Sequence, residues 1–260
     1  MLPIDEIICG DNVETLQAFP DACIDLTVTS PPYDSLRVYG GHSWDFEGVA
    51  QQLWRVTKPG GVVVWVVADA TVNGSETGTS FRQALRFMEI GFRLHDTMIW
   101  NKPPAGANGS VYSYSQSAEY MFVLARGKPK SINLLRDRAN VSVGSVSFKT
   151  SGGRCNKNDG AKEHGRRTVQ PKGLRTNVWT TTIGATSGDT TNHPAIFPEA
   201  LARDHILSWS NEGDIVLDCF SGSGTTAKMA KHNGRHWIGI EINQEYCEIA
   251  HKRLRQNVLF

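Results

Sequence analysis

Asp218-Cys219-Phe220-Ser221-Gly222-Ser223-Gly224-Thr225-Thr226 joins a short apolar run, residues 215–217, to a segment with helical spacing that ends before Gly234. The apolar run predicts a buried strand, and the segment after the glycines predicts a helix. Glycines let the backbone approach a ligand closely, and the free N–H groups at a helix start can hydrogen-bond that ligand. Strand, glycine loop and helix in this order predict a cofactor cradle in an α/β protein, although a tight turn without a ligand has the same pattern.

A second predicted strand, residues 236–240, ends in Glu241, whose carboxylate can accept hydrogen bonds from both hydroxyls of a ribose. The acid follows Gly222 by about 20 residues, so the pattern also fits the fingerprint of a dinucleotide-binding fold. Only 19 residues follow Glu241, too few for the further strands and helices that a doubly wound sheet requires. We therefore expect the rest of the sheet to come from the N-terminal part of the chain.

The composition favours a cytoplasmic globular protein. With 260 residues, 40% of them hydrophobic, the chain can form one large core, or a core with a small insertion. No apolar run has the length of a transmembrane helix, and the first residues lack the pattern of a signal peptide. The five cysteines include no C-x-x-C pair, which predicts reduced thiols and neither a disulfide framework nor a metal site.

A second motif, Ser30-Pro31-Pro32-Tyr33, directly follows a predicted strand over residues 24–29. Two consecutive prolines end a strand and fix an extended, rigid backbone. A hydroxyl and a carbonyl are then held at set positions with an aromatic ring beside them. Such a site can accept hydrogen bonds from a planar amine and stack on a flat ring. The alternative interpretation of the motif is a proline turn without a ligand.

Asp11 occupies a position with two possible roles. It follows a predicted strand over residues 4–9, where side chains of α/β sheets commonly face a ligand. It also precedes a predicted helix over residues 13–19, which an aspartate or asparagine would cap well. One residue can do both jobs, and both roles stay open.

Together the two motifs resemble those of the S-adenosylmethionine-dependent DNA amino-methyltransferases. In that family an (S/D/N)-P-P-(Y/F) tetrapeptide holds the target base, and an F-x-G-x-G loop binds the cofactor. Here these are Ser30-Pro31-Pro32-Tyr33 and Phe220-Ser221-Gly222-Ser223-Gly224, in the circularly permuted order called the β group. The resemblance implies an α/β, circularly permuted Rossmann-like methyltransferase fold: a seven-stranded mixed sheet with helices on both faces and a small basic insertion.

The sequence also predicts the remaining elements of this fold. Strands are expected over residues 62–67, 94–100 and 118–125, and helices over 46–56, 79–90, 199–209 and 245–254. The segments around Trp100, Lys102, Glu119 and Tyr120 match W-x-K-P and A-E-Y segments of the family. We expect one methyltransferase domain over 1–260, with a catalytic part (1–125), a target-recognition insertion (126–191) and a cofactor-binding part (192–260).

The resemblance implies the site residues as well. The catalytic residues would be Ser30, Pro31, Pro32 and Tyr33. The segment from His193 to Pro198 matches H-P-A-x-F-P, which lines the pocket for the methionine end of the cofactor. The expected S-adenosylmethionine-binding residues are Asp11, His193, Phe197, Pro198, Asp218, Phe220, Gly222, Gly224, Thr225, Thr226 and Glu241.

Residues 126–175 differ in charge from the rest of the chain. They hold 13 of the 27 Lys and Arg but only 3 of the 26 Asp and Glu, so this window carries +10 and the remainder −9. A basic segment of this kind can contact the phosphates of a nucleic acid. The alternative interpretation of the window is a solvated loop. The candidates for DNA contact are Arg154, Arg166, Arg167, Lys172 and Arg175, and RNA stays an alternative partner because charge does not distinguish the sugars.

The first residue of the tetrapeptide bears on the target base. Ser30 favours the N4 amine of cytosine, because the adenine-N6 enzymes of the family more often carry Asp or Asn at this position. The expected reaction is direct, in-line methyl transfer to a flipped-out base, with a proton leaving through Ser30 to water. An adenine-N6 enzyme, an NAD-binding oxidoreductase and a catalytically decayed DNA-binding protein are the alternatives, and a monomer and a homodimer both stay open.

Overall fold

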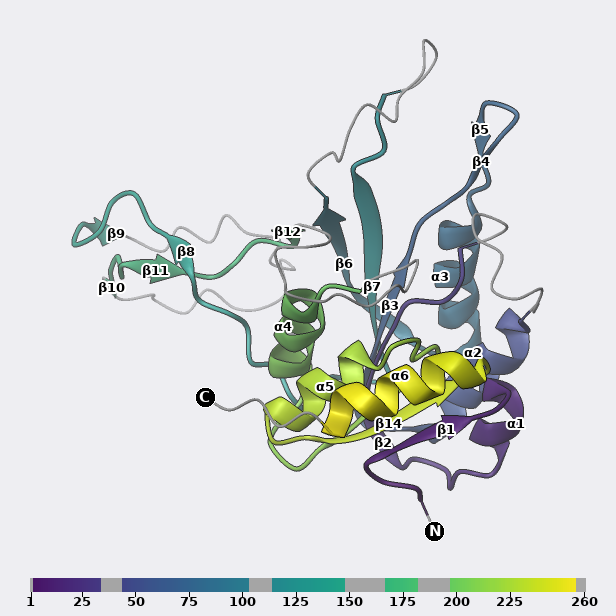
Figure 1. Cartoon of the computed structure of the whole chain (residues 1–260). Helices are drawn as coiled ribbons and strands as arrows, with labels where there is room; N and C mark the ends of the chain where they lie inside the picture. Colours follow the sequence, from purple (N-terminus) through teal and green to yellow (C-terminus); the bar gives the residue numbers. More distant parts are fainter. Residues whose placement is uncertain (1, 34–43, 103–113, 148–166, 182–196, 256–260) are drawn as a thin grey trace. The chain divides into compact units, whose positions relative to one another are not determined.

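The computed structural model describes residues 2–33, 44–102, 114–147, 167–181 and 197–255 (Figure 1). The chain divides into two compact units: Met1–Asn133 with Asn177–Phe260 is the main unit, and Leu134–Thr176 is the smaller unit. The main unit is built on one large sheet. Its strands are β1 (Glu6–Cys9), β2 (Ile24–Thr29), β3 (Thr57–Val67), β6 (Arg93–Asn101), β7 (Ala118–Ala125), β12 (Val178–Thr180), β13 (Ile215–Asp218) and β14 (His236–Glu241).

The strand order is β1-β14-β13-β2-β3-β7-β6-β12. Among these described strands, β7 is antiparallel to both of its neighbours, and every other pair is parallel. The N-terminal strand β1 pairs with the C-terminal strand β14, with Cys9 opposite Glu241. Both ends of the chain therefore contribute to one side of the sheet, which confirms the expected mixed α/β fold.

All seven expected strands are present, and two details differ from the expectation. The short strand β12 adds an eighth member, in which Trp179 lies opposite Trp100 of β6. Strand β3 begins at Thr57 instead of Val62, so Lys58-Pro59-Gly60-Gly61 belongs to the strand. Gly60 takes a positive φ of 85° there, a conformation that glycine adopts without strain, and this allows the strand to begin before the expected Val62.

Helices cover both faces of the sheet (Figure 1). They are α1 (Asn12–Gln17), α2 (Phe46–Val56), α3 (Thr79–Ile90), α4 (Glu199–Trp209), α5 (Thr225–His232) and α6 (Gln244–Arg255). Helix α2 contacts α1 and α3, whereas α5 contacts α4 and α6. The stripe Val49, Ala50, Leu53 and Val56 of α2 is fully buried, as its helical spacing predicts.

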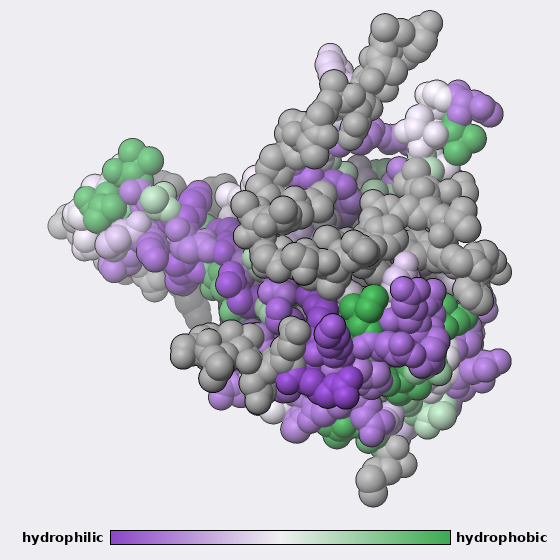
Figure 2. All heavy atoms as spheres, in the orientation of Figure 1, coloured by the Kyte–Doolittle hydropathy of each residue, from purple (hydrophilic) through white to green (hydrophobic). Residues whose placement is uncertain are grey.

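The centre of the sheet is apolar on both sides. Every residue of β3 from Val62 to Val67 is buried, as expected for a strand covered by helices on both faces. Trp65 packs edge-on against Phe87 of α3, with ring centroids 5.1 Å apart. The opposite surface of the helices is polar: the face that carries α6 is covered mainly by hydrophilic side chains (Figure 2).

The described residues of the smaller unit form two short antiparallel ladders. Strand β8 (Arg138–Ala139) pairs with β11 (Lys172–Gly173), and β9 (Val146–Ser147) pairs with β10 (Arg167–Thr168). A further two-stranded ladder of the main unit joins β4 (Thr71–Val72) to β5 (Ser75–Glu76). No helix within the described part of the chain has both the length and the apolar character needed to span a membrane.

Candidate active site

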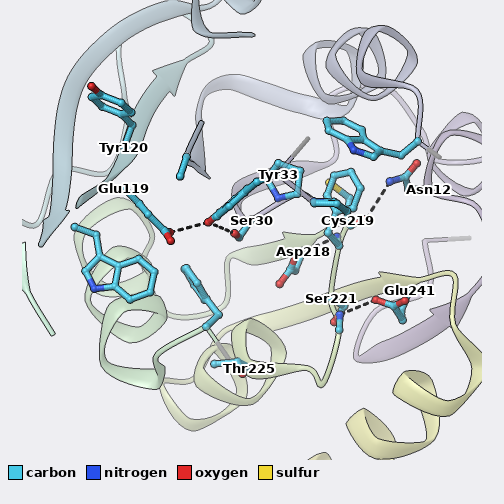
Figure 3. Close-up of a pocket in the computed structure, with 18 of the residues that line it drawn as sticks. Asn12, Ser30, Tyr33, Glu119, Tyr120, Asp218, Cys219, Ser221, Thr225 and Glu241 are labelled. Carbon is cyan, nitrogen blue, oxygen red and sulfur yellow. Dashed lines mark hydrogen bonds between the residues drawn. The ribbon is translucent and has the colours of Figure 1, made fainter. Parts of the chain in front are cut away.

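A cavity of about 730 Å³ lies where the main sheet's strands end (Figure 3). The carboxyl ends of β1, β2, β13 and β14 contribute Gly10, Ser30, Asp218 and Glu241 to its lining. Strands β13 and β2 are neighbours, and the helices that follow them, α5 and α2, belong to the two different helix groups. A crevice forms at such a switch point because the chain leaves the two strands toward opposite faces.

The glycine loop forms one wall of the cavity. Gly222 and Gly224 have positive φ values of 49° and 79°, which side chains other than glycine rarely adopt. A Cβ atom at Gly224 would lie 2.9 Å from the Cβ of Ala250, so this glycine lets the start of α5 pack closely on α6. Gly222 lines the cavity, and its N–H donates to Glu241 Oε2 at 2.8 Å.

Two carboxylates lie at the ends of neighbouring strands beside this loop. Asp218 accepts hydrogen bonds from Thr29 Oγ1 at 2.7 Å and from the Phe220 N–H at 3.1 Å. Burial raises the pKa of Asp218 to about 6, against the opposing effect of these hydrogen bonds. Glu241 accepts from the N–H groups of Gly222 and Asn243.

This wall fits S-adenosylmethionine, which carries cationic sulfonium and ammonium groups and a ribose diol. A buried carboxylate at Asp218 suits a cationic ligand, because a nearby positive charge would offset the desolvation of the ionised form. Ser221 lines the cavity, but its Oγ is buried beside Gly239 of β14 and makes no hydrogen bond to any residue that the structure describes.

Asp11 combines the two roles that its sequence position allows. Its Oδ1 accepts a hydrogen bond from the Glu14 N–H at 3.0 Å, which caps α1, and the residue also lines the cavity. The next residue, Asn12, donates from Nδ2 to the Cys219 carbonyl at 3.3 Å. The end of β1 is thereby tied to the glycine loop.

The tetrapeptide Ser30-Pro31-Pro32-Tyr33 forms a second wall of the same cavity. Ser30 Oγ lies 2.9 Å from Tyr33 Oη, and Tyr33 Oη donates to Glu119 Oε2 at 2.7 Å (Figure 3). Lys102 forms an ion pair with the other oxygen of Glu119. The structure thus brings the expected catalytic residues and most expected cofactor residues to one cavity.

The remaining expected cofactor residues are divided between the cavity lining and other positions, and Gly224, which precedes the first turn of α5, is outside the lining. Phe197 lines the cavity and packs edge-on against Trp100, with centroids 6.4 Å apart, and Thr225 also lines it. Pro198 and Thr226 are buried outside the lining: Pro198 precedes the first turn of α4, and Thr226 Oγ1 donates to the Val28 carbonyl at 3.3 Å. His193 lies outside the described residues.

The expected DNA contacts fall in or near the smaller unit. Arg167 lies in β10 and Lys172 in β11, whereas Arg154 and Arg166 are outside the described residues. The Arg175 guanidinium binds Asp137, with Nε 2.9 Å from Oδ2. This contact holds the pKa of the Asp137 carboxyl below its usual value. Arg175 therefore forms an ion pair within the smaller unit.

Three residues in or beside the cavity had no role assigned to them from the sequence. Arg253 of α6 is buried, and its Nη1 donates to the Ser223 carbonyl at 2.8 Å and to Ser223 Oγ at 2.7 Å. Trp44 lines the cavity and meets Phe220 edge-on, with centroids 5.0 Å apart. Glu119 carried a sequence signal, because it stands in the A-E-Y segment, but nothing there indicated a role.

Comparison with known proteins gives the class of this chain. Residues 24–252 match the N6_N4_Mtase family, described as DNA methylase, so the chain belongs to this family of DNA methyltransferases. Its cofactor is S-adenosylmethionine. Membership of this family overturns the oxidoreductase alternative.

The chain is similar to individual methyltransferases and to solved structures over most of its length. The chain is 54% identical to the orphan methyltransferase M.BamHII of Bacillus amyloliquefaciens, over 92% of this chain and 91% of that protein. The type II methyltransferase M.BglII of Bacillus subtilis is 28% identical over 96% of this chain and 69% of that protein. PvuII DNA methyltransferase (cytosine-N4-specific) shares the fold, with a TM-score of 0.70 at 20% identity over 98% of this chain and 87% of that one. The structure of the M1.HpyAVI–SAM complex is similar with a TM-score of 0.64 at 22% identity, over 96% of this chain and 99% of that one.

Proposed function

We propose that this DNA methyltransferase acts on the exocyclic N4 amine of cytosine. The observation that carries the proposal is the position of Ser30, first residue of the tetrapeptide, in the same cavity as Asp218 and Glu241. Methyltransferases of this family that act on adenine N6 more often carry Asp or Asn where this chain has serine. Adenine N6 is therefore the second candidate.

The tetrapeptide would prepare a weak nucleophile. The lone pair of an exocyclic amine is conjugated with the base ring, so the nitrogen attacks poorly while it stays planar. Ser30 Oγ and the Pro31 carbonyl would accept the two amine hydrogens, which lets the nitrogen become pyramidal and aim its lone pair at the methyl group. Fixed orientation of this kind supplies a large part of an enzymatic rate enhancement.

The other walls of the cavity would bind the two substrates. Glu241 would accept hydrogen bonds from the ribose hydroxyls of S-adenosylmethionine, with Gly222 and Phe220 beside it. When bound, S-adenosylmethionine supplies a methyl group on a positively charged sulfur and leaves as the neutral thioether. The target base would leave the duplex to reach the cavity, where the Tyr33 ring offers a stacking surface.

DNA would bind through the basic residues of 126–175. Lys172 and Arg167 lie on the short ladders of the smaller unit, and side chains on such ladders can follow a phosphate backbone or enter a groove. This assignment rests on the charge of +10 in the window. It gives the smaller unit the role of target recognition.

The product identifies the target base. Unmethylated genomic DNA is incubated with the enzyme and labelled S-adenosylmethionine, and the nucleosides are then separated by mass spectrometry. We expect N4-methylcytosine from the wild type and far less of it from Ser30→Ala. N6-methyladenine as the labelled product would contradict the cytosine assignment.

A further inference from the structure

We infer that Glu119 is a positioning residue for methyl transfer: acting through Tyr33, it directs the Ser30 hydroxyl and receives the proton that the target amine releases. The inference rests on the proposed function of Ser30 as the acceptor of that amine. It adds a carboxylate from β7 to a reaction otherwise assigned to the tetrapeptide after β2.

A continuous chain of contacts connects the two strands. Ser30 Oγ lies 2.9 Å from Tyr33 Oη, and Tyr33 Oη lies 2.7 Å from Glu119 Oε2 (Figure 3). Lys102 holds the second carboxylate oxygen in an ion pair. Glu119 is only 6% exposed, and all four residues line the cavity that contains the glycine loop.

The sheet holds Glu119 and Lys102 at this end of the cavity. Strand β7 runs against its neighbours, so its first residues lie beside the last residues of β3 and β6. Glu119 is opposite Trp100 of β6, and the Lys102 N–H donates to the Ser117 carbonyl at 2.6 Å. The carboxylate is therefore fixed by backbone pairing as well as by its own contacts.

The contacts give the hydrogen-bond chain one direction. Glu119 is ion-paired with Lys102, and a carboxylate in such a pair accepts hydrogen bonds, so the single Tyr33 hydroxyl hydrogen points toward it. The Ser30 hydroxyl must then donate to Tyr33 Oη. The lone pairs of Ser30 Oγ are left to accept a hydrogen from the target amine, which is the orientation that the proposed reaction requires.

The same chain can remove the proton of the methylated amine. As nitrogen forms its bond to the methyl carbon, the carbon–sulfur bond breaks and its electron pair stays on sulfur, leaving the nitrogen with a positive charge. The N–H proton passes to Ser30 Oγ, the Ser30 proton to Tyr33 Oη and the Tyr33 proton to Glu119 Oε2. The products are the neutral N-methylated base, the neutral thioether and a protonated Glu119, which returns its proton to solvent.

The hydrogen-bond chain requires the hydroxyl group of Tyr33. The family motif also allows phenylalanine at this position, which keeps the ring and lacks the hydroxyl. Tyr33→Phe therefore separates stacking on the base from the hydrogen-bond chain. It removes one oxygen atom, so it tests the inference even if a change at Glu119 impairs folding.

The test compares single-turnover methylation rates and S-adenosylmethionine dissociation constants for Tyr33→Phe, Glu119→Gln and the double variant. Each single change should slow methylation by about tenfold, the effect of one lost hydrogen bond to a charged group, and should leave cofactor affinity near the wild-type value. The double variant should be no slower than the single ones, because either change interrupts the same chain. Glu119→Gln should also cost little further rate in a Ser30→Ala background.

Tyr120→Phe, combined with Tyr33→Phe, is the control for the expected non-additivity of the Tyr33 and Glu119 variants. Tyr120 follows Glu119 in β7, and its ring stacks on Phe122 with centroids 5.5 Å apart, outside the hydrogen-bond chain. Losses from Tyr33→Phe and Tyr120→Phe should therefore multiply. The inference is overturned if Tyr33→Phe keeps the wild-type rate, if Tyr33→Phe and Glu119→Gln multiply to about a hundredfold, or if Glu119→Gln slows Ser30→Ala as much as it slows the wild type. The wild-type product decides the target base separately, because cytosine N4 and adenine N6 are both exocyclic amines.

Discussion

Asp218 is a buried carboxyl whose ionisation lowers the stability of the folded protein. It is 6% exposed at the end of β13, and burial raises its pKa from 3.8 to about 6. The unfolded chain ionises this group at lower pH than the folded protein does. Stability contributed by the protonated form is thus fully present below about pH 4 and is lost as the pH rises through about 6.

Replacing Asp218 with asparagine should therefore change the pH dependence of stability. The free energy of unfolding of the wild type, relative to Asp218→Asn, should fall by about 1 kcal/mol between about pH 5 and about pH 7.5. Denaturant titrations at both pH values measure this difference. The exposed Glu212→Gln is the control, and a constant offset between wild type and Asp218→Asn would contradict the shifted pKa.

Single residues also show what sequence can predict of the site. Ser30 to Tyr33 and the glycine loop are recognisable because prolines and glycines constrain the local backbone directly. Glu119 meets Tyr33 across 86 positions of sequence, through the pairing of β6, β7 and β3. No short-range pattern contains that contact, so its partners become visible only in the folded sheet.

Helix α6 contacts the glycine loop through the side chain of Arg253. Besides Ser223, this guanidinium contacts Thr225 Oγ1 at 3.2 Å and Glu199 Oε1 at 3.0 Å. The loop, α4 and α6 are thus held by a single buried cation. Glu199 keeps a second partner in Lys228, whose Nζ lies 2.6 Å away.

Arg253→Met tests this support. The methionine fills similar space but leaves the Ser223 carbonyl without its donor, so we expect about 2 kcal/mol lower stability and about tenfold weaker S-adenosylmethionine binding. Calorimetry of cofactor binding and thermal unfolding measure the two effects. Arg255→Met, an exposed position on the same helix, is the control; equal effects of both variants would show that Arg253 has no special role.

Element boundaries could be predicted wherever the residue pattern was long and regular. The expected ranges of α2, α3, β7 and α4 agree with the structure because each has a clear apolar period or an end signal. Strand β12 has three residues and owes its existence to pairing with β6. The early start of β3 likewise depends on its neighbours, against the local preference of Pro59 and Gly60 for a turn.

The charge of the whole chain is divided between its parts. Residues 126–175 carry +10 and the remainder −9, and the composition alone could predict that division. Within the described part of the smaller unit, Asp137 neutralises Arg175. Phosphate contact would then depend on other cations of the window, such as Lys172.

DNA binding should therefore depend steeply on salt. Displacement of counterions by the basic window makes the logarithm of the association constant fall with the logarithm of salt concentration, and Lys172→Ala should reduce that slope by about 1. Fluorescence anisotropy with duplex DNA over a salt series measures the slope. Arg93→Ala, which removes an exposed arginine of the main unit, is the matched control, and an equal change of slope in both variants would argue against the smaller unit as the DNA contact.

The two walls of the cavity are assigned different tasks, and the dissociation constant of S-adenosylmethionine tests that division most directly. Titration calorimetry on the wild type, Ser30→Ala and Glu241→Gln should give about tenfold weaker binding for Glu241→Gln, which loses a charged acceptor for the ribose. Ser30→Ala should bind the cofactor as the wild type does while losing methylation. Weaker binding by Ser30→Ala, or wild-type affinity in Glu241→Gln, would contradict the assignment of cofactor and target amine to opposite walls of one cavity.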